Sequence, residues 1–389
     1  MIVVIGGGLS GLAAALTVQE RGQQVHLIEG NENVGGRLAT ERIDGFTIDR
    51  GFQVINPGYR EFERLGLRTH IHPIPAGAVA FVDERWHFYG DPRRELRAMG
   101  GSLPIIATNP ISFLAILRGI FIATIAEGES AADFLQRIGI SGEVYEGIIE
   151  PFLRGVFLTS LSEVDAKFAR RVLRSLYRHV PGLPDGGVAT VAIELRNRLK
   201  SIQCGARVTA ITRSGKGFSV TTENSTISAR RVIVATDYHS AAQFSNRLPR
   251  ITHARSSAWY FAIEEPLRAQ HQLYVSRAHS GPVVTAIDVA SVVPSYSPDG
   301  RGLLSVTTLA PCSESEVREH LAKMYGEPFT GELIAQFDIA NALPILAPGA
   351  ERNGAINEEG LIFAGDYLTE PSQNGALLSG RLAGEFALA

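Results

Sequence analysis

The chain has 389 residues, 45% of them apolar and 20% charged, which is the balance of an ordinary soluble globular protein long enough for two domains. A formal net charge of -3 provides no overall basic field, so we expect no nucleic-acid partner. The only cysteines, Cys204 and Cys312, share no short spacing with each other or with a histidine pair, which argues against a disulfide framework or a zinc site. No charged leader or cleavage site precedes the apolar segment after Met1, so we expect a cytoplasmic protein.

The N-terminal segment predicts a βαβ unit. Residues 2–5 indicate a short buried strand, residues 9–21 a helix, and residues 24–28 a second strand. A glycine turn of the form G-x-G-x-x-G joins the first strand to the helix, and Glu29 ends the second strand. This order is the signature of a dinucleotide-binding site.

The residues of this turn have distinct expected roles. Gly6 permits the tight turn, Gly8 lets the backbone approach a pyrophosphate, and Gly11 allows close packing of helix on strand. The helix N-terminus attracts the phosphate charge, and the Glu29 carboxylate accepts the ribose hydroxyls. The residues assigned to this end of the cofactor are Gly6, Gly8, Leu9, Ser10, Gly11 and Glu29.

The next part of the chain is predicted to leave the nucleotide-binding unit. Residues 46–49 indicate a strand, and residues 79–82 and 86–88 a hairpin. From 103 to 180 the periodicity is helical and is interrupted by prolines. The apolar run at 111–126 is too short to span a membrane. A buried helix or a pocket wall is the simpler interpretation of it, and a peripheral membrane contact is the alternative.

Strands return after a helix that is predicted to end at Lys200. They are expected at residues 207–212, 218–222, 231–235, 260–263, 303–306 and 361–364. A final helix is predicted from Gly375. Nucleotide-binding patterns therefore occur at the start, in the middle and at the end of the chain, which predicts an α/β fold whose Rossmann-type domain is discontinuous.

We divide the chain into two domains on this basis. Residues 1–75, 182–245 and 340–389 are assigned to the cofactor domain. Residues 76–181 and 246–339 are assigned to a mixed helix-plus-sheet substrate domain. The cofactor is expected where the two domains meet.

Three further motifs carry a family resemblance. Residues 35–38 read Gly-Gly-Arg-Leu, and residues 45–52 read Gly-Phe-Thr-Ile-Asp-Arg-Gly-Phe. Near the C-terminus, residues 363–366 read Phe-Ala-Gly-Asp, and residues 374–376 read Asn-Gly-Ala. In these motifs the chain resembles the flavin amine oxidase superfamily, which includes phytoene desaturases and protoporphyrinogen oxidases.

The resemblance implies that the dinucleotide is FAD, held noncovalently because the C-terminal motif contains no cysteine. It implies that the Arg37 guanidinium meets the pyrophosphate and that Asp366 meets the ribityl or phosphate part of FAD. The last helix would point its N-terminus at the flavin. The other FAD-binding residues that it implies are Gly36, Leu38, Gly51, Phe52, Gln53, Val208, Ala235, Gly365, Asn374, Gly375 and Ala376.

No catalytic acid, base or nucleophile is recognisable, and the candidates for facing the substrate are Gln53, Tyr260 and Tyr367. Amine-oxidising members of the family commonly carry a lysine on a strand of the substrate domain, and residues 255–310 contain none. The resemblance therefore favours a desaturase-like reaction, in which FAD removes hydride from a small to mid-sized apolar substrate that the protein mainly orients. An amine oxidase that releases hydrogen peroxide is one alternative, and a non-redox flavin-dependent isomerase or mutase is another.

Three clusters of charged or titratable residues are interpreted as structural. His70 and His72 flank Ile71, but with no third ligand nearby in the sequence we interpret them as ordinary histidines. Arg170, Arg174 and Arg178 recur at helical spacing, and we interpret them as a solvated helix face rather than a lipid or phosphate patch. The same interpretation applies to Arg93, Arg94 and Arg97.

Overall fold

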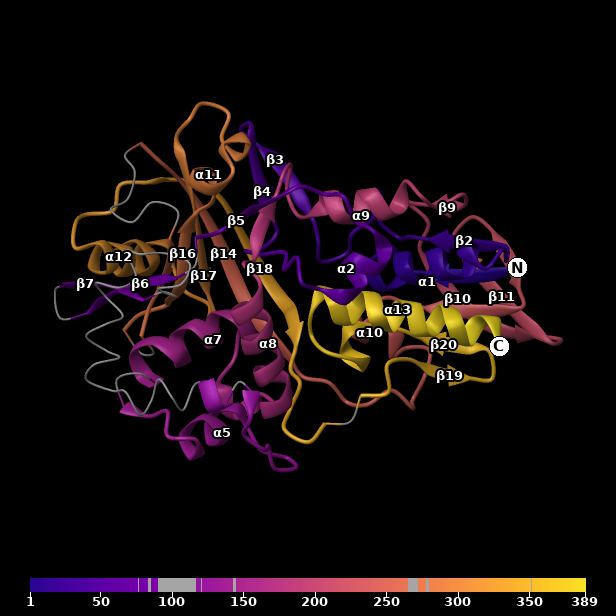
Figure 1. The fold of residues 1–389 in the computed structure, drawn as a ribbon. Coiled ribbons are helices and arrows are strands. Elements are labelled where there is room, and N and C mark those ends of the chain that lie inside the picture. The colour runs from indigo at the N-terminus through magenta and orange to yellow at the C-terminus, as the bar shows by residue number, and fades with distance from the viewer. Residues whose placement is uncertain are drawn as a thin grey trace.

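The computed structural model describes residues 1–75, 77–82, 85–89, 117–119, 121–142, 145–264, 272–277, 280–350 and 352–389. These residues form a mixed α/β fold with two main sheets that lie at opposite ends of the molecule (Figure 1). Both termini lie at the same end, beside the six-stranded sheet. Arg93, Arg94, Arg97 and the first part of the predicted helical segment lie outside the described residues.

The six-stranded sheet is built from the start, the middle and the end of the chain. Its order is β19 (Ile356–Glu358), β20 (Leu361–Phe363), β13 (Arg231–Val234), β1 (Ile2–Ile5), β2 (Val25–Ile28) and β9 (Ile202–Gln203). All neighbours are parallel except β19 and β20, so the predicted βαβ unit and the strands at 231–235 and 361–364 are confirmed. The central strand β1 is buried on both faces, as its unbroken apolar sequence predicts.

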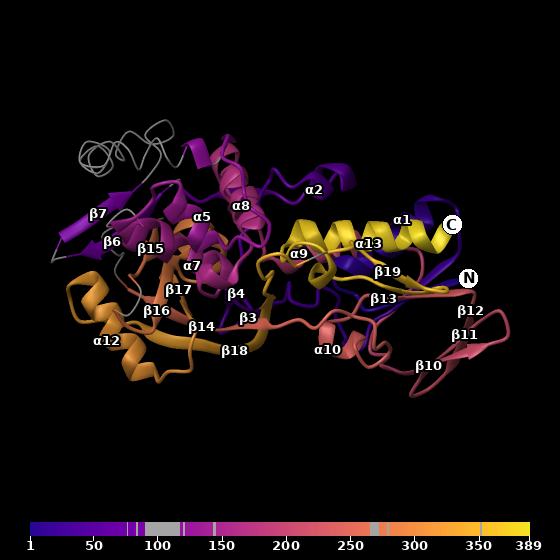
Figure 2. The same cartoon turned by 90° about the horizontal axis from the view of Figure 1, so that it is seen from below.

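Two layers cover this sheet. Ile2 and Val4 of β1 pack against α1 (Leu9–Glu20) and α13 (Gln373–Leu388). Val3 and Ile5 point the other way, toward the antiparallel sheet of β10 (Val208–Ser214), β11 (Gly217–Thr222) and β12 (Thr226–Ala229). Figure 2 shows the two layers on opposite sides of the six-stranded sheet. The alternation along β1 therefore determines which layer each residue supports.

Helices α1 and α13 approach each other closely because α13 carries glycine at the contact. A methyl group added at Gly380 would lie 2.0 Å from the carbonyl oxygen of Ser10. One added at Gly384 would lie 2.8 Å from Cβ of Thr17. The last helix is therefore packed along the helix that follows the glycine turn, which brings the two ends of the chain to one site.

The seven-stranded sheet has the order β18 (Glu332–Pro344), β14 (His253–Ile263), β17 (Gly302–Thr308), β16 (Val283–Asp288), β15 (Leu273–Val275), β6 (Ala78–Val82) and β7 (Arg85–Tyr89). The predicted hairpin at 79–88 is thus part of this sheet and not of the helical part. The domain boundary that we place at residues 339 and 340 falls inside β18. No strand is predicted here from the sequence, and β18 pairs with β14 over most of its length.

The two faces of β14 contact different elements, as its alternating sequence predicts. Tyr260 and Ala262 pack toward β4 (Phe46–Asp49), which pairs with β3 (Thr40–Ile43). Trp259 and Phe261 pack against α12 (Glu314–Tyr325). Figure 2 shows α12 on one side of the seven-stranded sheet and the helices α5 (Ala131–Arg137), α7 (Glu150–Phe157) and α8 (Ala166–Arg178) on the other.

The remaining described elements are short. They are α2 (Arg60–Leu65), β5 (Ile71–Pro73), the π-helical turn Tyr145–Ile149, the 3-10 turn Leu161–Glu163, β8 (Gly182–Pro184), α9 (Ala189–Arg196), α10 (Tyr238–Ala241), α11 (Val289–Val292), and the 3-10 turns Pro294–Tyr296 and Asp366–Leu368. The prediction that the helix before β9 reaches Lys200 is wrong, because it ends at Arg196. Beyond that residue the amides of Arg198 and Leu199 bond three residues back, which tightens the chain into a turn.

Among the helices that the structure describes, none combines the length and the apolar character needed to cross a membrane. The apolar run at 111–126 is described only at 117–119 and 121–126, so the structure does not test it as a whole. Within the described part, Phe121 and Ile122 expose 40% and 78% of their surface.

Candidate functional site: a dinucleotide cradle

The first glycine turn is shaped by contacts that exclude larger side chains. Gly6 has φ of 103°, and a methyl group added there would lie 2.6 Å from the carbonyl oxygen of Ala235. A methyl group added at Gly11 would lie 1.8 Å from the carbonyl oxygen of Gly6. Both glycines therefore serve close packing of strand, turn and helix, as the motif predicts.

Gly8 is different, because a methyl group added there would have no atom of the described residues within 4 Å, apart from those of Gly8 itself and its two chain neighbours. It precedes α1 with φ of -73°, and no side chain caps this helix N-terminus. The first turn of α1 also carries no acidic residue. The free amides of this turn and the open space at Gly8 fit a bound phosphate group.

The next two residues contribute backbone to this cradle and side chains to the core. Leu9 is 5% exposed and belongs to the core beneath α1. The hydroxyl of Ser10 donates a hydrogen bond of 2.8 Å to the carbonyl oxygen of Ala376 in α13. Ser10 therefore links the first helix to the last, and only the backbone of these two residues remains for a phosphate.

Glu29 stands at the carboxyl end of β2, where the motif predicts the ribose acid. One of its oxygens accepts a hydrogen bond of 2.5 Å from the Gly7 amide, and the other accepts one of 2.8 Å from the Asn31 amide. The residue is 7% exposed, so its carboxylate is held in a fixed orientation at the edge of the cradle. Its remaining lone pairs fit the hydroxyls of a ribose.

The middle segment of the chain reaches the same edge. The amide of Ala206 donates to the carbonyl oxygen of Glu29 at 2.9 Å, and Arg207 lies next to Gly30. Val208 follows as the first residue of β10, where its side chain packs against the apolar layer on β13. Its backbone is thus near the ribose acid, where the resemblance implies the adenine.

The second glycine turn lies directly against the first. Gly35 forms a parallel bridge with Gly8, and its amide donates to the carbonyl oxygen of Gly7 at 2.9 Å. Gly36 has φ of 61°, a conformation that glycine adopts without strain. Leu38 then anchors the turn with a side chain that is 6% exposed. This anchoring leaves Arg37 beside the cradle.

Arg37 and the C-terminal Asp366 meet, although 329 positions separate them in the sequence. The guanidinium nitrogen of Arg37 lies 2.6 Å from a carboxylate oxygen of Asp366, and a second nitrogen donates to the carbonyl oxygen of Ala342 at 3.2 Å. Asp366 is buried, whereas 43% of the Arg37 side chain is exposed. The arginine can therefore turn toward a phosphate while the acid stays in place.

A second arginine faces this pair. Burial lowers the pKa of Arg352, and the nearby Asp366 carboxylate opposes that shift. Its Nε is buried and has no hydrogen-bond partner within the described residues. An unpartnered guanidinium N–H near the Asp366 carboxylate suits an anionic cofactor. No motif in the sequence points to Arg352, so sequence reasoning missed it.

The segment after β4 lies between the cradle and the seven-stranded sheet. Gly51 has φ of 93°, and a methyl group there would lie 2.9 Å from Cδ1 of Ile339 in β18. Phe52 is partly buried against the core on this face of the sheet. The amide nitrogen of the Gln53 side chain donates to the carbonyl oxygen of Arg37 at 2.8 Å.

The strand end at Ala235 and the C-terminal motif complete the cradle. The Ala235 amide donates to the carbonyl oxygen of Ile5. This bond places the carbonyl group of Ala235 against Gly6. The amide of Gly365 donates to the hydroxyl of Ser379 at 2.9 Å. This bond ties the turn that carries Asp366 to α13.

The N-terminus of α13 points into the same region. Ser372 caps it by accepting from the Gly375 amide at 2.9 Å, and the Asn374 side chain accepts from the Glu61 amide at 3.1 Å. The side-chain oxygen of Gln373 is buried without a partner in the described chain. Ala376 follows, 9% exposed. The end of this helix thus offers partial positive charge and unused polar atoms for a ligand.

Comparison with known proteins identifies this arrangement. Residues 9–385 match the family described as flavin containing amine oxidoreductase. The chain belongs to this flavin-containing oxidoreductase family.

Two curated relatives match part of this chain. The chain is 24% identical over 316 residues to a coproporphyrinogen III oxidase of Bacillus subtilis, and the match covers 66% of this chain and 63% of that protein. It is 29% identical over 279 residues to a carotenoid phi-ring synthase of Streptomyces griseus, covering 61% of this chain and 52% of that protein. The matches therefore span about half to two thirds of these longer relatives.

The fold of this oxidoreductase also matches solved structures. An oxidoreductase from Methanosarcina mazei superposes with a TM-score of 0.79 at 17% sequence identity, over 99% of both chains. At this identity the likeness shows the mixed α/β fold alone. It agrees with the predicted fold class.

Two tyrosines that we selected as substrate-facing are buried, and both hydroxyls are directed to backbone carbonyl oxygens. Tyr260 is 2% exposed, and its hydroxyl donates to the carbonyl oxygen of Asp49 at 2.7 Å. Tyr367 is also 2% exposed and packs against Tyr238, with its hydroxyl directed to the carbonyl oxygen of Ala364. Burial raises the pKa of both phenols well above the ordinary value, so both hydroxyls stay protonated near neutral pH.

Asp49 is a buried carboxyl that our search for site residues missed. It is 5% exposed and accepts hydrogen bonds from the Val188 amide at 3.0 Å and from the Thr40 hydroxyl at 2.6 Å. Burial raises its pKa from 3.8 to about 6, although both hydrogen bonds oppose this shift. Asp49 thereby caps the start of α9 and holds it against the β3–β4 hairpin.

The histidine pair also gains a neighbour that sequence reasoning missed. Nε2 of His72 lies 2.8 Å from a carboxylate oxygen of Asp185, and His70 lies beside them. A third possible ligand therefore lies near the two histidines in space, although none lies near them in the sequence. Asp185 is distant in sequence, and the pairing of β5 with β8 brings it to the histidines.

Proposed function

We propose that this family member is an FAD-dependent dehydrogenase that removes hydride from a C–H bond of a small to mid-sized apolar organic substrate. The observation that carries the proposal is the cradle formed by the two glycine turns, Glu29, Arg37 and the N-terminus of α13. Bound FAD would supply the hydride acceptor. The protein's own part is to hold the cofactor, orient the substrate and exclude water.

In this proposal, different residues bind different parts of the cofactor. Glu29 holds the ribose, and the amides at Gly8 and the start of α1 hold a phosphate. Arg37 exchanges part of its contact with Asp366 for the pyrophosphate. The N-terminus of α13 stabilises negative charge on the reduced flavin ring.

The lysine distribution supports oxidation of carbon rather than of an amine. The chain has four lysines, Lys167, Lys200, Lys216 and Lys323, and none lies on β14 or β18. Lys323 belongs to α12, which covers the face of β14 opposite to β4. The relatives named for a coproporphyrinogen and a carotenoid ring point the same way, because neither is named for an amine substrate.

The arginines of α8 weaken the mutase alternative. Arg170 donates to the carbonyl oxygen of Ala123 at 2.6 Å, and Arg171 forms an ion pair with Glu370. These side chains hold neighbouring segments of this chain, so our interpretation of the helix as a purely solvated face is wrong. A diphosphate substrate would have to displace these contacts.

Three substrate panels distinguish the reactions. We expect anaerobic addition of an apolar polyene or a reduced tetrapyrrole to bleach the oxidised-flavin absorbance, with a product two hydrogens poorer. Hydrogen peroxide released aerobically from amines, with no bleaching by the apolar panel, would support the amine oxidase instead. Conversion of a substrate to an isomer without net redox change would contradict both.

The cofactor site is tested separately from the substrate. Glu29→Ala should lower FAD occupancy of the purified protein at least tenfold, since the ribose loses a charged acceptor worth about 1.5–3 kcal/mol. Glu32→Ala removes an exposed acid from the following loop and serves as the matched control. Equal occupancy in both variants would mean that the ribose does not bind at Glu29.

Noncovalent attachment is part of the proposal. Cys312 contacts Thr308 on β17, and Cys204 lies in the segment beside Glu29, far in the chain from the C-terminal motif. Flavin should therefore leave the denatured protein intact on filtration. Flavin that stays with the denatured chain would contradict this part of the proposal.

A peripheral membrane contact is proposed for the surface around Ile122. Phe121 packs on Tyr177 of α8, so the exposed Phe121 and Ile122 lie beside the basic residues of that helix. Apolar side chains next to arginines suit the interface of an anionic bilayer. Sedimentation with vesicles of anionic lipid should decrease for Ile122→Glu, and Ile193→Glu on α9 is the exposed apolar control.

A further inference from the structure

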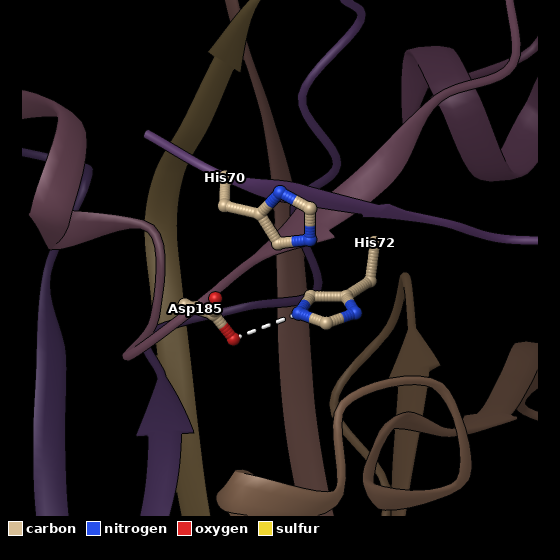
Figure 3. A group of neighbouring side chains, drawn as sticks. All are labelled: His70, His72 and Asp185. Atoms are coloured by element: carbon tan, nitrogen blue, oxygen red, sulfur yellow. Dashed lines mark hydrogen bonds and ion pairs between the residues drawn. The ribbon is translucent and has the colours of Figure 1, made fainter. Parts of the chain in front are cut away.

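A second cluster of polar side chains lies outside the cofactor cradle. His70, His72 and Asp185 each offer a ligand atom, and these atoms all lie within 4.8 Å of one another (Figure 3). The two imidazole rings are 4.6 Å apart between centroids and nearly perpendicular at 85°. His70 and Asp185 are exposed and His72 is half-buried, so an ion reaches the cluster from solvent.

The backbone holds the three residues in place. His72 pairs with Leu183 in the antiparallel ladder of β5 and β8, and the Asp185 amide donates to the carbonyl oxygen of His70 at 3.1 Å. A methyl group added at Gly182 would lie 2.2 Å from the carbonyl oxygen of His72, so the two strands are in close contact. The arrangement is therefore set by regular pairing.

The chemistry of the donors selects a class of ion. Two imidazoles and one carboxylate match the three protein ligands of an open zinc site, in which water takes the fourth position. In a tetrahedral zinc site neighbouring ligand atoms lie about 3.3 Å apart. The His72–Asp185 pair is already at 2.8 Å, and rotation of the exposed His70 side chain closes the wider separation. Mg²⁺ prefers oxygen ligands and fits this set poorly.

The position of the cluster in the chain suggests what an ion does there. His70 and His72 come immediately before the segment 76–181, and Asp185 comes immediately after it. A metal ion that joins the two ends of a long loop removes more conformational entropy from the unfolded chain than one that joins the ends of a short loop. An ion at this place joins the two ends of the segment that carries α5, α7 and α8.

We propose that His70, His72 and Asp185 bind one divalent late transition-metal ion, with Zn²⁺ as the fitting case, and that this ion fastens β5 to β8 at the base of the segment 76–181. The proposal does not depend on the flavin chemistry. In this proposal the ion has a structural role and takes no part in the transfer of electrons or protons.

Binding is tested on the tag-free flavoprotein after treatment with EDTA and dialysis. Competition between the protein and a chromophoric chelator should give one equivalent of Zn²⁺, and Co²⁺ should give the intense visible absorption of a tetrahedral site. His70→Ala, His72→Ala and Asp185→Asn should each raise the dissociation constant at least tenfold. Asp299→Asn, which removes another exposed acid, should leave the constant unchanged.

The clip is tested by hydrogen exchange with and without Zn²⁺. Peptides that cover residues 70–73 and 182–187 should exchange at least tenfold more slowly with Zn²⁺, and a peptide from α12 should not change. His72→Ala should abolish the slowing. Absence of stoichiometric binding, or equal binding by the three variants and the wild type, would overturn the site. Binding without slower exchange in these peptides would overturn the clip.

Discussion

The buried carboxyl of Asp49 predicts a specific dependence of stability on pH. Its pKa is raised from 3.8 to about 6 in the folded protein, mainly because burial penalises the charged form. The folded state therefore holds this proton more tightly than the unfolded state does. The stability that this provides is complete below pH 3.8 and is lost as the pH rises through about 6.

The magnitude follows from the difference between the two pKa values. A rise from 3.8 to about 6 corresponds to a loss of about 3 kcal/mol of unfolding free energy once Asp49 is ionised. Asp49→Asn cannot ionise, and its carbonyl oxygen can still accept from the Val188 amide and the Thr40 hydroxyl. We therefore expect the variant to match the wild type near pH 4 and to exceed it by about 1–3 kcal/mol near pH 8.

The assay compares urea unfolding of the FAD-loaded wild type and variant at pH 4.5, 6 and 8. The quantity of interest is the difference in unfolding free energy between the two proteins at each pH, because other groups titrate equally in both. Asp44→Asn is the control, since Asp44 is exposed at the turn of the same hairpin. The reasoning would be refuted if this difference in unfolding free energy were the same at every pH. It would also be refuted if the wild type became more stable relative to Asp49→Asn as the pH rises.

Three other predictions concern the cradle. Gly11→Ala should destabilise the protein by at least about 2 kcal/mol, because its methyl group would overlap the Gly6 carbonyl. Gly8→Ala should leave the unfolding midpoint of the FAD-free protein within about 1 °C and yet lower FAD affinity at least tenfold, since its methyl group enters open space in the cradle. If both variants lose stability equally, the space at Gly8 has been misjudged. Arg37→Gln should weaken FAD binding at least tenfold with a smaller effect at high salt, measured by fluorescence titration, and equal affinity at every salt concentration would exclude a role in pyrophosphate binding.

Much of the cofactor region is decided by local sequence. The strand at 2–5, the glycine turn and the helix that follows are determined by an apolar run and by positions where only glycine fits. Glu29 is located by its distance from that turn, because a strand of given length ends at a predictable place. The two-residue alternation along β14 likewise places Trp259 and Tyr260 on opposite faces of the strand.

The tertiary structure alone decided which side chains are available and which distant residues meet. Tyr367 follows the C-terminal motif and Tyr260 lies on β14, but the burial of both depends on the layers packed around them and has no local signature. Asp185 reaches the two histidines through the pairing of β5 with β8. Arg352 lies near Asp366 in the fold, and no motif around it announces this position. A turn or a strand depends on neighbours in the chain, which the sequence contains. The partners of a side chain depend on neighbours in space, which only the fold supplies.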